Sequence, residues 1–413
     1  MDDHEGEWHR KNLRLGDDWK VDDIKYITTP MKVKIYVSFI GEAKCPICNS
    51  RCPKYDTRKR EWRDVDYGRA RCDIVASIPR ISCKTCGIRE IKVSWAGIAS
   101  NLTKGLEKSI LEMAKSSSIK GSATYHRVDE KTCWRILRTY TDIIVSYLDL
   151  YGMEIVLIDE TSSEKGHRYI SNVIDHRSGC VVFSTEGNDS SVLHAFRYWL
   201  IHHNCDPNGI KVICCDMSRA FIAGANEAFP NASLCFDKFH VIQHANLMVD
   251  NVRRKTGIKS RKAKGLRYGF TMNKEDLAEK NEEYQQKIRE TLDTYADLGR
   301  AYAIKEALRD FYDLDKPEHA AYFLRCLMIY CQRDTEEEIV SLGNMIKSHF
   351  DGILFWYSCK VSNGMAEGRN SVIQAMKCTS RGFKDVDNLI AMIQLRSTLK
   401  HPSIASNSLL PGI

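Results

Sequence analysis

Three carboxylate side chains stand where a divalent metal ion could be bound. Asp159 follows the apolar run 155–158 and Asp216 follows the run 212–215, so each falls at the end of a short buried strand. Open α/β sheets place their ligands at the carboxyl ends of strands, although a single strand-end aspartate is more often a cap or turn residue. Two such aspartates, with Glu367 on a later helix, predict a carboxylate site for divalent metal ions.

The cysteines form a second group with metal-ligand spacing. Two C-x-x-C pairs can each close a tight knuckle, and together they predict one structural Zn²⁺ held between β-strands. The predicted zinc ligands are Cys45, Cys48, Cys83 and Cys86. Cys52 and Cys72 rank second as ligands because neither belongs to a pair. A redox role would need a thioredoxin-like strand and helix around the motif, and the sequence lacks that pattern.

The composition bounds the class of protein. A chain of 413 residues predicts two to four domains. No apolar run approaches the roughly 20 residues of a membrane span, and the acidic start is unlike a secretory signal. We therefore expect a cytoplasmic, nucleoid-associated protein whose sixteen cysteines are reduced. The net charge of +7 is mild, so basic clusters such as 253–267 are either solvated faces or nucleic-acid contacts.

Strands are expected to position the four thiols. The alternation of apolar and polar residues in 31–37 predicts one strand, and 72–81 predicts another. With the C-x-x-C pairs, these strands make a zinc ribbon over residues 31–97. Residues 1–30 have no clear period and predict a poorly anchored polar leader.

Two features near the ribbon favour contact with nucleic acid. The basic stretch 51–63, with Tyr55 and Trp62 interleaved, predicts a phosphate-contacting face. Residues 98–150 then have helical spacing that Gly121 interrupts, which fits a helix-turn-helix DNA-binding domain or a small helical linker. The neighbouring ribbon and the basic residues favour the first. The predicted DNA contacts in this domain are Lys131, Thr132, Trp134 and Arg135.

The two aspartates are expected on one mixed sheet. Strands are predicted at 154–159, 168–175, 180–186, 210–216 and 233–237, and helices at 190–203, 219–228 and 239–254. Three successive strands followed by alternating helix and strand predict a multi-domain α/β protein whose mixed sheet has helices on both faces.

Glu367 is separated from that sheet by a long helical segment. Residues 255–360 lack strand alternation and predict an all-helical insertion between a first catalytic part, 151–254, and a last part, 361–398. Residues 399–413 are expected to be a frayed tail. Further DNA contacts are predicted at Arg253, Arg254 and Arg369.

Eight short segments, weak one by one, together resemble a known family. They are Ile158 to Glu160, Lys165 to Tyr169, Glu186 to Asp189, Cys215 to Ser218, Phe229 to Ala232, Asp237 to Ile242, Ser362 to Asn370 and Arg381 to Phe383. The sequence is similar to insertion-sequence transposases of the ISL-three family, which are DDE transposases with an RNase H-like catalytic domain. The order of zinc ribbon, helix-turn-helix and catalytic domain also agrees, and the resemblance covers about residues 40 to 398.

The resemblance implies that Asp159, Asp216 and Glu367 are the catalytic triad. Asp237 and His240 would lie near the site without being core ligands, and strand alternation would turn Glu160 away from it. Two Mg²⁺ or Mn²⁺ ions, roughly 4 Å apart, would hold the scissile phosphate between them. One ion would activate a water or a 3′-hydroxyl, and the other would stabilise the leaving oxygen.

The implied function is that of a bacterial insertion-sequence transposase. The zinc ribbon and helix-turn-helix would bind terminal inverted repeats, and the catalytic domain would cleave DNA strands and transfer them to target DNA. Joining two ends suggests at least a homodimer. The alternatives are a catalytically inactive or domesticated DNA-binding regulator, and an RNase H-like nuclease without strand transfer. A zinc-dependent hydrolase of small molecules fits the DNA-binding features poorly.

Overall fold

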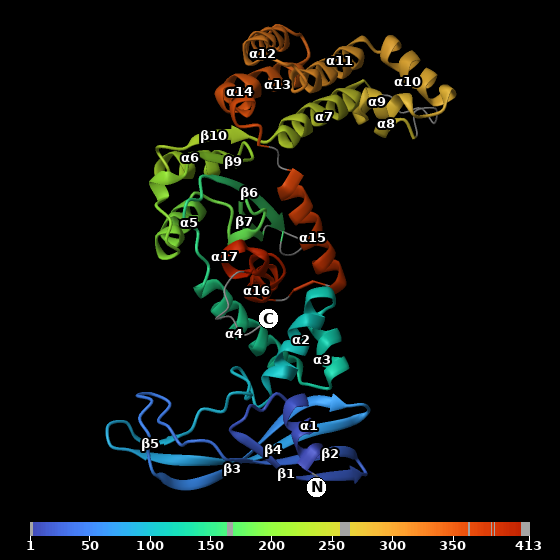
Figure 1. Cartoon of the computed structure of the whole chain (residues 1–413). Helices are drawn as coiled ribbons and strands as arrows, with labels where there is room; N and C mark the ends of the chain where they lie inside the picture. The colour runs from blue at the N-terminus through green and yellow to red at the C-terminus, as the bar shows by residue number, and fades with distance from the viewer. Residues whose placement is uncertain are drawn as a thin grey trace. The chain divides into compact units, whose positions relative to one another are not determined.

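The chain forms two compact units, whose elements are labelled in Figure 1. The first comprises Met1–Leu148 with Ile373–Ile413, and the second comprises Asp149–Val372. The computed structural model describes residues 3–162, 168–256, 265–361, 364–380, 382–383 and 385–405. For residues 3, 364–367 and 369–370, the structure describes the backbone and not the side chain.

A five-stranded sheet forms the N-terminal part of the first unit. Its strands are β1 (Trp19–Thr28), β2 (Met31–Phe39), β3 (Lys54–Tyr67), β4 (Ala70–Cys83) and β5 (Gly87–Glu90). β2 is antiparallel to β1 and parallel to β4. β4 is antiparallel to its other two neighbours, β3 and β5. Helix α1 (Asp3–Asn12) packs against β1. The two strands predicted around the thiols are therefore confirmed.

The inner face of this sheet is a tryptophan-rich core. The rings of Trp19 and Trp95 lie edge-on at 5.5 Å, and those of Trp62 and Trp95 at 5.0 Å. The prediction that Trp62 belongs to a phosphate-contacting face is wrong, because its ring packs against Trp95 in this core and is 3% exposed. The prediction of a poorly anchored leader at 1–30 is also wrong, since Trp19 and Leu15 are buried in this core.

Three helices follow the sheet in the first unit. They are α2 (Lys104–Ser116), α3 (Ile119–His126) and α4 (Glu130–Ser146). The prediction that Gly121 interrupts the helical pattern is wrong, because Gly121 lies inside α3. The break between α2 and α3 lies at Ser117 and Ser118. The Ser118 hydroxyl caps α3 by accepting a hydrogen bond from the Gly121 N–H. Arg127, with φ 53°, ends α3, and Asp129 caps α4. The short turn between α3 and α4 is typical of a helix-turn-helix.

A fully buried carboxylate organises these helices. Oε1 of Glu107 accepts hydrogen bonds from the Ala99 N–H at 3.2 Å and the Ser100 hydroxyl at 2.7 Å. Its Oε2 accepts from the Ile98 N–H and from the Tyr140 hydroxyl, both at 3.0 Å. Glu107 on α2 therefore joins the loop before this helix to α4.

The C-terminal helices also belong to the first unit. They are α16 (Val386–Arg396), the short 3₁₀ helix η3 (Thr398–Lys400) and α17 (Pro402–Ala405). α16 packs against α4, and Nη2 of Arg396 donates to the carbonyls of Ala114 at 2.9 Å and Ser117 at 2.8 Å, at the end of α2. The segment predicted as the last catalytic part, 361–398, is thus divided between the two units.

A second five-stranded sheet forms the centre of the second unit. Its strands are β6 (Ile155–Ser162), β7 (Tyr169–Asp175), β8 (Val181–Glu186), β9 (Val212–Cys215) and β10 (Ser233–Phe236). The strand order is β10-β9-β6-β7-β8. β7 pairs with β6 and with β8 in antiparallel fashion, whereas β9 is parallel to β6 and β10 is parallel to β9. All five predicted strands are confirmed. β6 continues three residues beyond its predicted end because Ser162 pairs with Tyr169.

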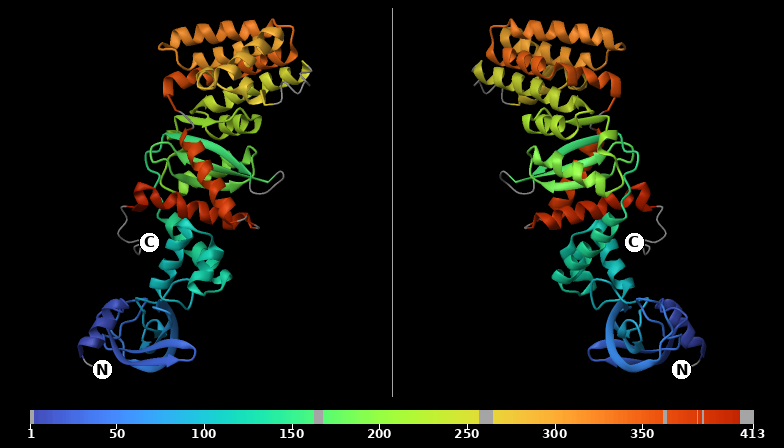
Figure 2. Two further views of the ribbon diagram at one scale, coloured as in Figure 1. Left: turned by 90° about the vertical axis from the view of Figure 1, so that its right-hand side faces the viewer. Right: turned by 90° about the vertical axis from the view of Figure 1, so that its left-hand side faces the viewer.

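Helices make up the rest of the second unit. α5 (Ser191–His202) and α6 (Arg219–Ala228) pack together beside the sheet. The residues described between 238 and 361 contain no strand and form α7 (Lys238–Lys255), α8 (Arg267–Thr271), α9 (Lys274–Ala278), α10 (Glu282–Thr294), α11 (Ala296–Phe311), α12 (Pro317–Gln332), α13 (Glu337–Ser348) and α14 (Phe350–Cys359). α11 packs on α7 and α12, and these helices lie side by side in Figure 2.

Helix α15 (Gly364–Ser380) carries the predicted glutamate. It follows α14 in the chain, as the sequence predicted for a helix starting near Met365. Within the described ranges, no helix combines the length and the apolar character that crossing a membrane requires.

Candidate catalytic and metal sites

Three aspartates stand in a row across the parallel strands of the second unit. β6 and β9 pair with Leu157 beside Cys214, so continuing the register by two residues brings Asp159 beside Asp216. β9 and β10 pair with Cys215 beside Phe236, which brings Asp216 beside Asp237. The charges of Asp216 and Asp237 act on Asp159, so the three carboxylates lie near one another. Asp159 is not at the end of its strand as predicted, because β6 continues to Ser162 and Asp159 pairs with Asn172 of β7.

The electrostatics of this edge are those of crowded carboxylates. Burial raises the pKa of Asp159 to about 6, and the charges of Asp237 and Asp216 act in the same direction. Burial and then the charge of Asp216 raise the pKa of Glu160 to about 7. Glu160 thus stays within electrostatic reach of the row, although alternation was expected to turn it away. Such a cluster is stabilised by a bound cation.

A histidine lies beside the same carboxylates. Asp237 is 1% exposed and precedes α7, and its Oδ2 lies 3.1 Å from Nδ1 of His240. This hydrogen bond, followed by the charges of Asp237, Asp159 and Asp216, raises the pKa of His240. The expectation that Asp237 and His240 lie near the predicted site is confirmed.

For Glu367, the third predicted carboxylate, the structure describes only the backbone. Glu367 lies in the first turn of α15, and its side chain is outside the described residues. The side chain of Arg369 and the motif residues 165–167, Ser362, Asn363 and Arg381 are outside them as well. The structure therefore brings together Asp159 and Asp216, while Glu367 as their partner stays a prediction.

The four predicted zinc ligands converge in the first unit. The Sγ atoms of Cys45, Cys48, Cys83 and Cys86 all lie within 4.8 Å of one another, and no other group of three or more His, Cys, Asp or Glu in the described chain does so. The Cys48 and Cys83 sulfurs are 3.6 Å apart. A tetrahedral zinc with bonds of roughly 2.3 Å needs sulfur–sulfur edges of roughly 3.8 Å, so the group fits.

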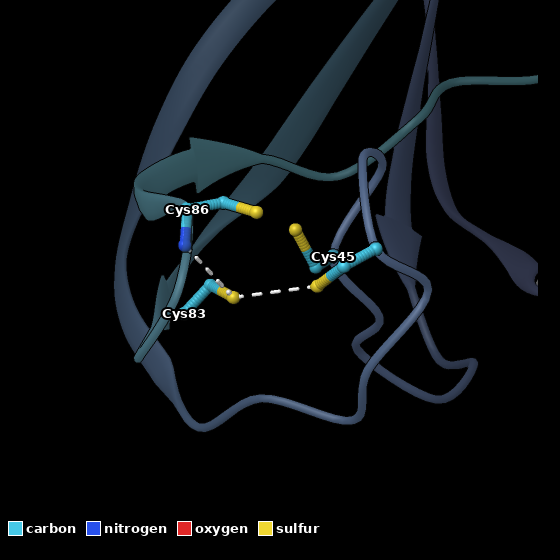
Figure 3. A group of neighbouring side chains, drawn as sticks. Cys45, Cys83 and Cys86 are labelled. Atoms are coloured by element: carbon cyan, nitrogen blue, oxygen red, sulfur yellow. Dashed lines mark hydrogen bonds between the residues drawn. The ribbon is translucent and has the colours of Figure 1, made fainter.

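Local hydrogen bonds favour the thiolate form of Cys48 and Cys83, whereas burial raises the pKa of Cys86 to about 12. Figure 3 shows the side chains of Cys45, Cys83 and Cys86 pointing toward one another. The Cys86 N–H donates to the Cys83 sulfur at 3.4 Å, and this bond is the first cause of the lowered pKa of Cys83. Hydrogen bonds from Ser50 lower the pKa of Cys48 to about 6. Cys72, a second-rank candidate, lies outside the group as a buried thiol whose pKa burial raises.

The predicted DNA contacts of the helix-turn-helix differ in accessibility. Lys131 and Arg135 are exposed on α4, and Thr132 is half-buried. Trp134 is also half-buried, and its ring packs edge-on against Phe383 at 6.1 Å. Lys131 and Arg135 are therefore available to a ligand, whereas Trp134 contributes to packing within the first unit.

Two further predicted contacts are engaged in ion pairs at the end of α7. Nη2 of Arg253 and Nη2 of Arg254 each lie 2.7 Å from a carboxylate oxygen of Asp250. The Arg253 side chain is 19% exposed and the Arg254 side chain 59% exposed. Of the two, only Arg254 could reach a phosphate without leaving its present position.

Comparison with known proteins places the chain in a family. Residues 156–393 match a family model of the ISL3 type that is described as transposase. The chain belongs to the ISL3 family of transposases. Its ISL3 helix-turn-helix domain matches at residues 91–141, and a zinc-finger of transposases IS204, IS1001, IS1096 and IS1165 matches at 41–86.

Relatives of this ISL3 transposase are similar over nearly their whole length. The transposase for insertion sequence element IS1557 of Mycobacterium tuberculosis (strain H37Rv) is 26% identical, over 90% of this chain and 89% of the relative. The transposase for insertion sequence element IS1001 of Bordetella parapertussis is 23% identical, over 85% of this chain and 87% of the relative.

Proposed function

We propose that this insertion-sequence transposase binds the terminal inverted repeats of its element and catalyses metal-dependent cleavage and transfer of DNA strands. The observation that supports the proposal is that the charge of Asp216 acts on Asp159, and that both residues follow the paired part of the parallel strands β6 and β9. Open α/β sheets bind ligands at this edge, and hard oxygen ligands suit Mg²⁺ and Mn²⁺. Glu367 of α15 completes the triad.

The catalytic domain has an RNase H-like fold in this proposal. The strand order β10-β9-β6-β7-β8 supports this fold, because the antiparallel strands β6, β7 and β8 are followed by β9 and β10, which run parallel to β6. The helices α8 to α14 form the all-helical insertion at 255–360, between catalytic parts at 151–254 and 361–398. Residues 31–97 and 98–150 form the zinc ribbon and the helix-turn-helix domain.

The residues of this chain have separate tasks in the reaction. When bound, two Mg²⁺ or Mn²⁺ ions supply Lewis-acid stabilisation of an in-line displacement at the scissile phosphate. Asp159 and Asp216 would hold and orient the cations, and Asp159 is half-buried. His240, held by its hydrogen bond with Asp237, lies beside the carboxylates, whose charges raise its pKa. The zinc site has only a structural task, since four cysteines leave no open position.

DNA is held by the first unit in this proposal. Lys131 and Arg135 lie at the exposed start of α4, which is the second helix of the helix-turn-helix and the one that enters the major groove. The zinc ribbon adds contacts to the phosphate backbone. Because two element ends must be joined, the active complex contains at least two copies of the chain.

A strand-transfer assay with the full-length protein tests this function. One substrate carries the intact element end with flanking DNA, and the other is pre-cut at the end. Cleavage of the first and joining of the second to a target plasmid, both in Mg²⁺ and neither in EDTA, is the expected result. Cleavage without joining identifies a nuclease instead, and end binding with neither reaction identifies a regulator.

A further inference from the structure

A cavity of about 640 Å³ lies within the first unit, away from the zinc site. The loop after α1, the turn between β3 and β4 and the start of α2 surround it. The residues that matter for its chemistry are Arg14, Asp64, Trp95, Thr103, Lys104 and Lys108. The cavity therefore lies where the sheet of the zinc ribbon meets the helix-turn-helix domain. Neither the zinc site nor the helix-turn-helix motif assigns a role to its lining residues.

Three cationic side chains line this cavity. Arg14, Lys104 and Lys108 form no ion pair with any residue whose side chain the structure describes. Burial, and then the charges of Arg14 and Lys104, lower the pKa of Lys108. Lys104 is also the first residue of α2, where the helix dipole disfavours a cation. The cations repel one another unless an anion lies between them.

The acidic residues of the cavity do not fully neutralise these cations. Burial raises the pKa of Asp64, whereas the hydrogen bond that its carboxylate accepts from the Thr103 hydroxyl and the charge of Arg14 act in the opposite direction, so Asp64 compensates part of the charge of Arg14. Asp66 pairs with Arg63 and Arg127, which leaves its charge already compensated. The three cations therefore outnumber the two carboxylates that line the cavity.

A buried donor in the cavity wall also lacks an acceptor. Trp95 is 4% exposed, and its Nε1–H has no hydrogen-bond partner among the described residues. Native proteins rarely leave a buried donor unpaired, because its lost hydration is then not replaced by a hydrogen bond. An oxygen-rich anion in the cavity would accept from the indole and neutralise the cations together.

We infer that this cavity binds a phosphate group of the DNA backbone. The inference rests on the DNA binding proposed above and names one place where the first unit grips its ligand. Cations and neutral N–H donors are the usual partners of backbone phosphates, and such contacts fix the register of a protein on DNA without reading sequence. The same chemistry would accept a free phosphate ion, so the test must separate the two sources.

The test compares three full-length proteins in salt-dependent DNA binding. The cavity variant carries Lys104→Gln and Lys108→Gln. The matched control carries Lys115→Gln, which removes a cation from the last turn of the same helix, where it pairs with Glu112 instead of lining the cavity. Binding of labelled element ends is measured over a range of salt concentrations. Arg14→Gln, at an exposed position, serves as a second cavity variant should the double variant not fold.

The expected result is a weaker and less salt-dependent interaction. The cavity variant loses about one phosphate contact, so the slope of log K against log salt falls by about 0.9 and affinity falls roughly 5–10-fold near physiological salt. The Lys115→Gln control keeps nearly the wild-type slope. Relief of repulsion also raises the melting temperature of the ligand-free cavity variant at low salt.

Each contrary result has a distinct meaning. A cavity variant that matches Lys115→Gln overturns the inference while leaving DNA binding intact. A melting temperature that rises with inorganic phosphate in wild type but not in the variant, with DNA binding unchanged, shows a free-anion site and overturns the DNA source. A wild-type protein that fails to bind element ends overturns the proposed function and this inference together.

Discussion

The buried carboxylate of Glu107 gives a stability prediction whose size follows from its contacts. Replacing it by Gln keeps the volume but leaves one carboxamide oxygen for four donors. The hydroxyls of Ser100 and Tyr140 can rotate to accept from the new NH₂ group, whereas the backbone N–H of Ile98 or Ala99 cannot. One orphaned donor in this half-exposed loop costs about 1–2 kcal/mol, and loss of the charge-assisted bonds adds about 1 kcal/mol.

Hydrogen exchange read by mass spectrometry measures this loss locally. A cost of about 3 kcal/mol, the upper limit of this sum, accelerates exchange in the loop before α2 by roughly 150-fold, because about 1.4 kcal/mol corresponds to a factor of ten. Tyr140→Phe removes one donor and should accelerate it only about 10-fold. Glu112→Gln, at an exposed position of the same helix, is the control. Unchanged exchange in Glu107→Gln would refute the assignment of Glu107 as the organiser of this loop.

Two further predictions concern the first unit. Cys83→Ser with Cys86→Ser should lower bound zinc from one ion per chain to none in elemental analysis, because two of four sulfur ligands are lost; retained zinc would contradict the site. Arg396→Met should destabilise the end of α2 by about 2–4 kcal/mol, because the carbonyls of Ala114 and Ser117 lose a charged donor. Hydrogen exchange at that helix end is the measurement, and protection equal to wild type would count against the contact.

Regular patterning explains what could be predicted from the sequence. The strands of the second sheet have long apolar runs, and the predicted helix at 219–228 has the bounds of α6. The paired cysteines also identified the zinc site, because their spacing fixes the geometry of each knuckle. Asp159 and Asp216 could be placed together because both follow buried runs on parallel strands.

Tertiary context explains the failures. Only the first few residues of β1 alternate in burial, so the pairing with β2, rather than a local pattern, makes it a strand. Gly121 is tolerated inside α3 because the serine cap ahead of it decides where the helix starts. The cavity at Arg14 and Lys104 joins segments about ninety residues apart, and no local spacing signals such a meeting.

The most direct test of the account is the catalytic rate of triad variants that still bind element ends. Asp159→Asn, Asp216→Asn and Glu367→Gln are each compared with Glu154→Gln, which lies just ahead of β6 at the opposite end from the carboxylate row. Loss of one metal ligand removes several kcal/mol of transition-state stabilisation, so we expect Mg²⁺-dependent cleavage to fall by about a thousandfold or more with end binding retained. The control should cleave at the wild-type rate. Near-normal cleavage by Asp159→Asn or Asp216→Asn would contradict the central claim.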